Sequence, residues 1–142
     1  MQKLLFRPFT PQDYDEVTAL WSTAGIKLTL SDSRPEIEKM LARNPGTCFV
    51  ALSDGSIIGA VMGSWDGRRG FVHHLAIRPE VQGTGAGKAM MKELERRFES
   101  MGVVKITFLV ESDNEKVLGF YEKLGYSVRG DLIAVSKTLR ER

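Results

Sequence analysis

The chain has 142 residues, of which 42% are hydrophobic and 27% are charged, and its formal net charge at pH 7 is +2. This length supports one domain with a sizeable core, so we expect a single domain over residues 1–142. The near-neutral charge and the scattered Lys and Arg residues argue against a nucleic-acid-binding protein. No apolar run approaches the ~20 residues of a membrane span and no signal peptide is visible, so we expect a cytoplasmic protein without a membrane partner.

The first third of the chain predicts one short strand followed by two helices. The strand covers residues 4–9. Thr10-Pro11 has the residue types of a helix start, and Gly25 is typical of a helix end. A second helix is expected after Ser33, which has capping-box spacing to a glutamate three residues later, and Asn44-Pro45-Gly46 ends it.

Three strands are expected next, around residues 47–53, 56–65 and 71–78. Asp54-Gly55 between two apolar runs is a strong hairpin signal. The single cysteine, Cys48, lies in the first of these strands. A lone thiol excludes an internal disulfide and is typical of a packed core residue in a reducing compartment.

A glycine-rich segment joins the third of these strands to an amphipathic helix. Glycines stand at positions 83, 85 and 87, and the helix carries apolar residues at helical spacing, namely Ala86, Met90, Leu94, Phe98 and Met101. Glycine permits positive φ and close approach of the backbone to a ligand, and a helix N-terminus offers unpaired N–H groups. The segment therefore predicts a site for a phosphate or pyrophosphate.

Two known phosphate loops do not fit this segment. A Walker A loop needs Ser or Thr after Gly87-Lys88, where this chain has Ala89, and Gln82 stands in place of its first glycine. A dinucleotide fingerprint would need a third glycine where Lys88 stands. A protein that binds ATP or NAD through this loop stays open as an alternative, as does an ordinary glycine-rich turn.

The last third of the chain predicts a strand, a helix and two further strands. The strand covers residues 105–111, and the helix starts near Ser112 and ends at Gly125. The final strands are expected at 126–129 and 132–137. The complete order is that of an α/β protein, a mixed sheet of six to seven strands flanked by about four helices, with helices on both faces.

Two motifs resemble those of the GNAT superfamily of N-acetyltransferases. Gln82-x-x-Gly85-x-Gly87, between a strand and a helix, is similar to the family signature Gln/Arg-x-x-Gly-x-Gly/Ala. Asn114, followed seven residues later by Tyr121 and then by Leu124-Gly125-Tyr126, looks like the second family motif. The loop at 63–70 resembles that of the short bacterial YpeA-type acetyltransferases. The resemblance covers nearly the whole chain and implies the GNAT fold.

This resemblance implies transfer of an acetyl group from acetyl-CoA to a primary amine of a small molecule or peptide, by direct attack of the amine. Tyr121 would act as the general acid near the CoA sulfur, because a phenol is protonated at neutral pH. The loop amides would bind the CoA pyrophosphate, and the preceding strand and Asn114 would bind the pantetheine arm. The implied cofactor-binding residues are Leu75, Ala76, Ile77, Gln82, Gly83, Thr84, Gly85, Ala86, Gly87, Lys88 and Asn114.

The general base is open at this stage. Many family members carry an acidic residue on the strand before the loop, but this chain has none between Asp66 and Glu80. His73 and His74 lie there instead, and adjacent strand residues are expected to face opposite sides of the sheet. Either histidine titrates near neutrality and is a candidate base, and Glu111 is a third. Two adjacent histidines without a cysteine or carboxylate cluster lack zinc-ligand spacing, so no metal is expected.

Each of these residues also has a structural explanation. Tyr121 at helical spacing is compatible with simple core packing, Asn114 with a helix cap, and the histidines with a structural role. A chain without a functional base would be a catalytically inactive acyl-CoA-binding module on the same fold. An exposed last strand would allow a homodimer about a two-fold axis.

Overall fold

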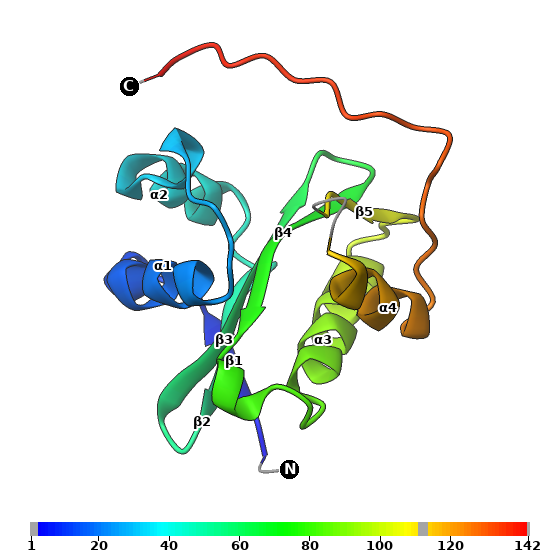
Figure 1. Ribbon diagram of the computed structural model, residues 1–142. Helices are drawn as coiled ribbons and strands as arrows, with labels where there is room; N and C mark the ends of the chain where they lie inside the picture. The colour runs from blue at the N-terminus through cyan, green and yellow to red at the C-terminus, as the bar shows by residue number, and fades with distance from the viewer. Residues whose placement is uncertain (1–2, 111–113, 142) are drawn as a thin grey trace. The chain divides into compact units, whose positions relative to one another are not determined.

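The computed structural model describes residues 3–110 and 114–141, which form two compact units, Met1–Phe108 and Leu109–Arg142. The first unit holds a sheet and three α-helices, and the second holds the fourth α-helix (Figure 1). The strands are β1 (Leu5–Pro8), β2 (Cys48–Ser53), β3 (Ser56–Trp65), β4 (Gly70–Ile77) and β5 (Ile106–Phe108). The helices of the first unit are α1 (Tyr14–Thr23), α2 (Arg34–Arg43) and α3 (Ala86–Ser100), with 3-10 turns η1 (Pro11–Asp13), η2 (Leu30–Asp32) and η3 (Pro79–Val81).

The sheet has the order β1-β2-β3-β4-β5, antiparallel throughout except for the parallel pair β4-β5. Asp54 and Gly55 join β2 to β3 with φ values of 50° and 79°. Positive φ at both central residues is the geometry of a type I′ hairpin turn, which confirms the predicted hairpin. The parallel pair needs a long crossover, and α3 supplies it.

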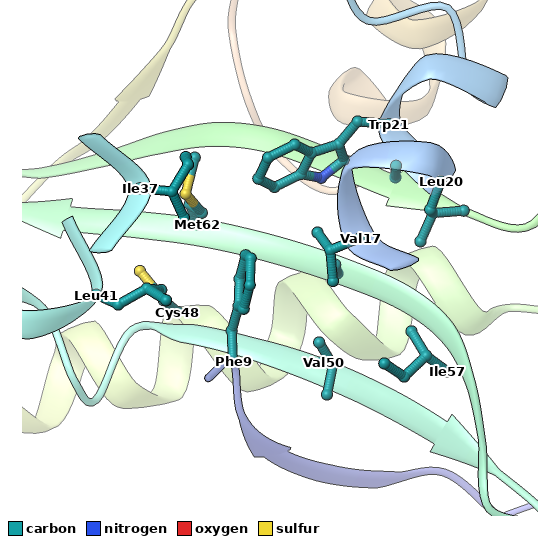
Figure 2. Packing of buried hydrophobic residues seen from close by; sticks show 12 residues of the cluster. Phe9, Val17, Leu20, Trp21, Ile37, Leu41, Cys48, Val50, Ile57 and Met62 are labelled. Atoms are coloured by element: carbon teal, nitrogen blue, oxygen red, sulfur yellow. The ribbon is translucent and has the colours of Figure 1, made fainter. Parts of the chain in front are cut away.

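Helices cover both faces of this sheet within the first unit. In Figure 1, α1 and α2 lie on one side of the sheet and α3 on the other. The α1/α2 side encloses a buried cluster (Figure 2) whose members are Phe9, Val17, Leu20, Trp21, Ile37, Leu41, Cys48, Val50, Ile57, Ala60, Met62 and Ala76. Burial of this much apolar surface is the main source of stability for such a layered unit. The α1/α2 layer also carries the turn η2, which matters for the site.

The second unit contains α4 (Glu115–Lys123) followed by a segment without regular structure. Among the described residues from 114 to 141 none lies in a strand, so the strands predicted at 126–129 and 132–137 are wrong. The sheet accordingly has five strands instead of six to seven. β-prone residues form a strand only where an edge pairs with them, and here Ile133 and Val135 are 89% and 91% exposed.

Other sequence predictions agree closely with the structure. Gly25, with φ of 88°, follows α1, and Gly85, with φ of 93°, caps the start of α3. The strand predicted at 105–111 is reduced to Ile106–Phe108, and the candidate base Glu111 and the helix start at Ser112 lie outside the described residues. In the part of the chain that the structure describes, no helix is both long and apolar enough to cross a bilayer.

Candidate functional site

A β-bulge in β4 determines where the two histidines point. Ala60 pairs with Ala76, and Met62 pairs with His73. The two residues His74 and Leu75 of β4 therefore lie opposite one residue of β3, Val61. His74 has a positive φ of 53°. A bulge of this kind inserts one extra residue and breaks the alternation of side chains.

The bulge corrects the expectation that His73 and His74 face opposite sides of the sheet. His73 pairs with Met62 of the α1/α2 cluster, and its Nε2 lies 3.0 Å from Oγ of Ser64 on β3. The ring of His74 packs edge-on against Trp21 of α1, with 4.9 Å between ring centroids. Both histidines therefore lie on the α1/α2 face, where the sequence rule of alternation places only one.

Asp32 of η2 is the closest polar partner of His74. Nε2 of His74 lies 2.7 Å from Oδ1 of Asp32, although the two residues are 42 positions apart in the sequence. Asp32 is 5% exposed, and its Oδ2 accepts a hydrogen bond from the backbone N–H of Thr29 at 3.0 Å. Its backbone carbonyl accepts a hydrogen bond from the Tyr14 hydroxyl at 2.6 Å. These contacts fix the carboxylate beside the imidazole.

Asp32 is not among the residues that the sequence motifs indicate. Its local signal is the spacing Thr29-x-x-Asp32, the same capping box that Thr10 and Asp13 form at η1. A capping box predicts a turn, and it carries no information about the distant strand that meets this turn. Trp21 of α1, whose ring packs against His74, has a buried indole N–H without a partner in the described structure.

The pKa values of Asp32 and His73 are both lowered, for different reasons. Burial alone would raise the pKa of Asp32, but hydrogen bonds from His74 and Thr29 outweigh it and hold the pKa below its usual value. His73 is an exposed residue, yet desolvation of its ring by the surrounding protein disfavours the charged form and lowers its pKa. The neighbouring His74 lowers the pKa of His73 further, and Asp32 opposes this.

The glycine-rich loop keeps its backbone N–H groups free. Gly83 and Gly85 have φ values of 82° and 93°. Within the described residues, the N–H groups from 83 to 88 donate to no protein acceptor. Side chains hold the loop instead, because Gln82 Nε2 donates to the carbonyl of Ile77 at 3.3 Å and Thr84 Oγ1 donates to that of Val81 at 2.6 Å. A cluster of free N–H groups at a helix start can bind a phosphate or pyrophosphate.

Within residues 3–110 and 114–141, the second half of β4 has no strand partner on the β5 side. β5 pairs only with Gly70, Phe71 and Val72. Residues 73–77, which include the predicted cofactor-binding residues Leu75, Ala76 and Ile77, pair with β3 alone among the described strands. An unpaired strand edge offers N–H and C=O groups to an extended ligand that carries amides.

Asn114 and Tyr121 belong to the second unit. Asn114 caps α4, since its Oδ1 accepts a hydrogen bond from the N–H of Val117 at 3.3 Å. Tyr121 is 8% exposed and contacts the rings of Phe120 and Tyr126 edge-on. Burial raises the pKa of Tyr121 to about 12, so its phenol stays protonated over the whole physiological range.

The buried cysteine is neither a candidate nucleophile nor a candidate metal ligand. Cys48 is buried in the core, and burial raises the pKa of its thiol to about 12. A thiol with so high a pKa is a poor nucleophile and ligand, in agreement with a packing role. The described residues contain no group of three His, Cys, Asp or Glu side chains that could hold a metal ion.

Comparison with known proteins agrees with this architecture. Residues 12–126 match the sequence model of the acetyltransferase (GNAT) family. The structure is similar to Ard1 from Thermoplasma volcanium, with a TM-score of 0.81, 20% identity and coverage of 89% of this chain and 84% of that one. It is also similar to the PaiA N-acetyltransferase of Thermoplasma acidophilum in complex with coenzyme A, with a TM-score of 0.78, 20% identity and coverage of 90% and 92%. Chaetomium thermophilum Naa20 in complex with a bisubstrate analogue gives a TM-score of 0.76, 22% identity and coverage of 87% and 71%.

Proposed function

Because the chain belongs to the acetyltransferase (GNAT) family, we propose that it is an N-acetyltransferase that moves the acetyl group of acetyl-CoA to a primary amine. The observation that carries this proposal is the set of free backbone N–H groups at residues 83–88, which follow η3 and the half of β4 that pairs with no described strand on the β5 side. These two features supply donors for a pyrophosphate and a strand edge for the amides of pantetheine. The fold shared with an N-acetyltransferase in complex with coenzyme A supports the choice of co-substrate.

Under this proposal the loop N–H groups bind the pyrophosphate, with Lys88 adding a positive charge at the exposed first turn of α3. Residues Leu75, Ala76 and Ile77 pair with the pantetheine amides, and one of their N–H groups polarises the thioester carbonyl. Asn114 adds a hydrogen bond to the same arm. Bound acetyl-CoA supplies an activated acetyl thioester, and the protein supplies orientation and proton transfer.

Two proton-transfer groups complete the proposal. A histidine of β4, His73 or His74, accepts a proton from the attacking amine, because imidazole titrates near neutrality. The phenol of Tyr121 donates a hydrogen bond and then a proton to the departing thiolate. The acceptor is the amine of a small molecule or of a peptide.

The finer assignments rest on the resemblance. The family match runs from residue 12 to residue 126 and so crosses the boundary at 108/109, which supports one GNAT domain built from both compact units. The sequence of residues 63–70, from the end of β3 to the start of β4, supports a place near the YpeA-type acetyltransferases. A cytoplasmic location is part of the same proposal. The homodimer loses its support, because the last strand that was expected to form it is not a strand in the described structure.

Calorimetric titration with acetyl-CoA, ATP and NAD tests the cofactor site. Gly83→Asp is the informative variant, because a Cβ at Gly83 would meet no protein atom within 4 Å. Gly102→Asp is its matched control, since Gly102 also has an open Cβ position and a φ of 81° against 82° for Gly83. Asp tolerates positive φ better than most residues, so both variants should lose similar, small amounts of stability.

We expect the wild type to bind acetyl-CoA and neither ATP nor NAD. Gly83→Asp should weaken this binding at least about tenfold, which is roughly 1.4 kcal/mol, through bulk and charge beside the pyrophosphate. Gly102→Asp should bind as the wild type does. If the wild type does not bind acetyl-CoA, or if both variants lose the same affinity for it, the proposed cofactor site is wrong.

A second measurement separates an enzyme from an inactive acyl-CoA-binding module. The release of the free CoA thiol is followed with a panel of amines, namely a peptide with a free α-amine, lysine, spermidine and an aminoglycoside. Acetylated product, identified by mass, supports the transferase. Binding of acetyl-CoA without product from any amine would support the module.

A further inference from the structure

The side chains of His74 and Asp32 form a hydrogen-bonded pair in which only the His74 side chain is open to solvent. Nε2 of His74 lies 2.7 Å from Oδ1 of Asp32. The side chain of His74 is 26% exposed and that of Asp32 is 6% exposed. The carboxylate is therefore enclosed, whereas part of the ring stays accessible to a substrate.

The hydrogen bond to Asp32 determines the tautomer of His74. Asp32 is ionised, because hydrogen bonds from His74 and Thr29 outweigh burial and keep its pKa low. An ionised carboxylate only accepts hydrogen bonds. Nε2 of His74 must therefore carry the hydrogen atom, and in the neutral ring the lone pair resides on Nδ1. Among the described residues Nδ1 of His74 makes no hydrogen bond.

We propose that Asp32 is a positioning residue that holds His74 in the Nε2–H tautomer, so that Nδ1 of His74 accepts the proton of the amine that is acetylated. This inference rests on the function proposed above and selects His74 over His73 as the base. The inference also gives a role to Asp32 of η2, a residue that does not itself contact the substrate.

The proton balance of the step is simple. The amine nitrogen forms a bond to the acetyl carbon while the carbon–sulfur bond breaks, and the amine proton passes to Nδ1 of His74. The phenol of Tyr121 gives a proton to the thiolate. The imidazolium then releases its extra proton to solvent, and Tyr121 takes one back. Asp32 stabilises the imidazolium through the Nε2–H bond without becoming protonated.

Three elements contribute groups around the His74 ring. Asp32 of η2 lies within hydrogen-bond distance of the ring, His73 of β4 is its neighbour in the chain, and α1 contributes the uncharged ring of Trp21. The φ of 53° at His74 is uncommon for a residue other than glycine. Such conformations persist where the surroundings fix them and are frequent at active sites.

Asp13 offers a matched control for any substitution at Asp32. Both aspartates are the third residue of a 3-10 turn in a Thr-x-x-Asp capping box, and they are 8% and 5% exposed. Asp13 pairs with Arg7, at 2.8 Å and 2.9 Å, instead of with a histidine. Asp13→Asn therefore weakens a capping box in the same way as Asp32→Asn but leaves the His74–Asp32 pair intact.

The tautomer is measured directly from the imidazole ¹⁵N signals of the intact protein. The chain contains two histidines, so the spectrum holds two ring systems, and His73→Gln assigns them. We expect His74 as the Nε2–H tautomer in the wild type and in Asp13→Asn. In Asp32→Asn, the Thr29 N–H fixes the amide oxygen, so that the amide NH₂ faces Nε2 and moves the hydrogen to Nδ1. An Nδ1–H tautomer in the wild type, or no change in Asp32→Asn, would overturn the proposal.

The kinetic arm uses acetyl-CoA and the amine of the panel above that is acetylated fastest. Asp32→Asn and His74→Gln should each lower kcat at least about tenfold, with KM for acetyl-CoA changed less than about twofold. Asp13→Asn should keep the wild-type kcat. A wild-type kcat in Asp32→Asn would contradict the proposal. A failure of the wild type to bind acetyl-CoA would contradict the proposed function instead, and the tautomer of His74 would still be decided by the ¹⁵N measurement.

Discussion

Thr47 and Gly63 hold β3 against the start of β2 through two short hydrogen bonds. The N–H of Gly63 donates to the carbonyl of Thr47 at 2.8 Å, and the hydroxyl of Thr47 donates to the carbonyl of Gly63 at 2.7 Å. A Cβ at Gly63 would lie 2.9 Å from the Thr47 carbonyl oxygen and 3.0 Å from side-chain atoms of Leu94 and Phe98 on α3. Glycine is required here because the backbone of β2 and the helix α3 both approach it closely.

We therefore predict that Gly63→Ala lowers the free energy of unfolding by about 1–3 kcal/mol, through overpacking against a backbone atom that cannot move away. Chemical denaturation monitored by circular dichroism measures this. Gly46→Ala is the control, because a Cβ there meets nothing within 4 Å and no positive φ is required. Its effect should be neutral or stabilising by up to about 1 kcal/mol. Equal stability of the two variants would show that β3 and α3 separate easily.

The parts of the fold that local sequence determines were predicted correctly. Asp54-Gly55 requires positive φ at both residues, and few other sequences allow it, so the hairpin was predicted at its observed position. Gly25 and Gly85 mark the end of α1 and the start of α3 for the same reason. The glycine-rich segment was likewise placed between a strand and a helix.

The parts that depend on distant contacts were missed. The bulge at His74 breaks the alternation that the sequence pattern assumes, and it forms only where β4 meets β3. Asp32 reaches His74 across 42 positions, which no local pattern encodes. The final strands were predicted from β-propensity alone, and propensity does not supply the edge that a strand must pair with.

His73 should make the protein less stable in mild acid. Its pKa is lowered in the folded state, so the unfolded chain binds a proton at higher pH than the folded one. Stability is then complete above the unfolded value of 6.5 and is lost as the pH falls below it towards the folded value. The melting temperature of the wild type should fall between roughly pH 7.5 and roughly pH 5.5, and His73→Gln should reduce that fall. An identical fall in both proteins would assign the acid sensitivity to other groups.

Asn114 has two proposed roles that one substitution can separate. Its Oδ1 caps α4 by accepting the N–H of Val117, and Asp can do the same, whereas only Asn carries an amide N–H for the pantetheine arm. Asn114→Ala should lower the free energy of unfolding by about 1 kcal/mol through loss of the cap. Asn114→Asp should keep the stability and still weaken acetyl-CoA binding in calorimetry. Unchanged binding in Asn114→Asp would leave Asn114 as a helix cap alone.

Tyr121→Phe tests the proposed acid without removing the aromatic ring. The ring contacts with Phe120 and Tyr126 are kept, so acetyl-CoA affinity should change less than about twofold, whereas kcat should fall about 100-fold or more.

The raised pKa of Tyr121, about 12, adds a second signature. Its phenol stays protonated in any ordinary assay, so Tyr121 should contribute no alkaline limb to the wild-type pH–rate profile below roughly pH 11. An alkaline limb near neutrality that disappears in Tyr121→Phe would mean that the phenol loses its proton near neutrality, which would contradict its raised pKa. An unchanged kcat would remove Tyr121 from the mechanism and leave the thiolate to be protonated by solvent.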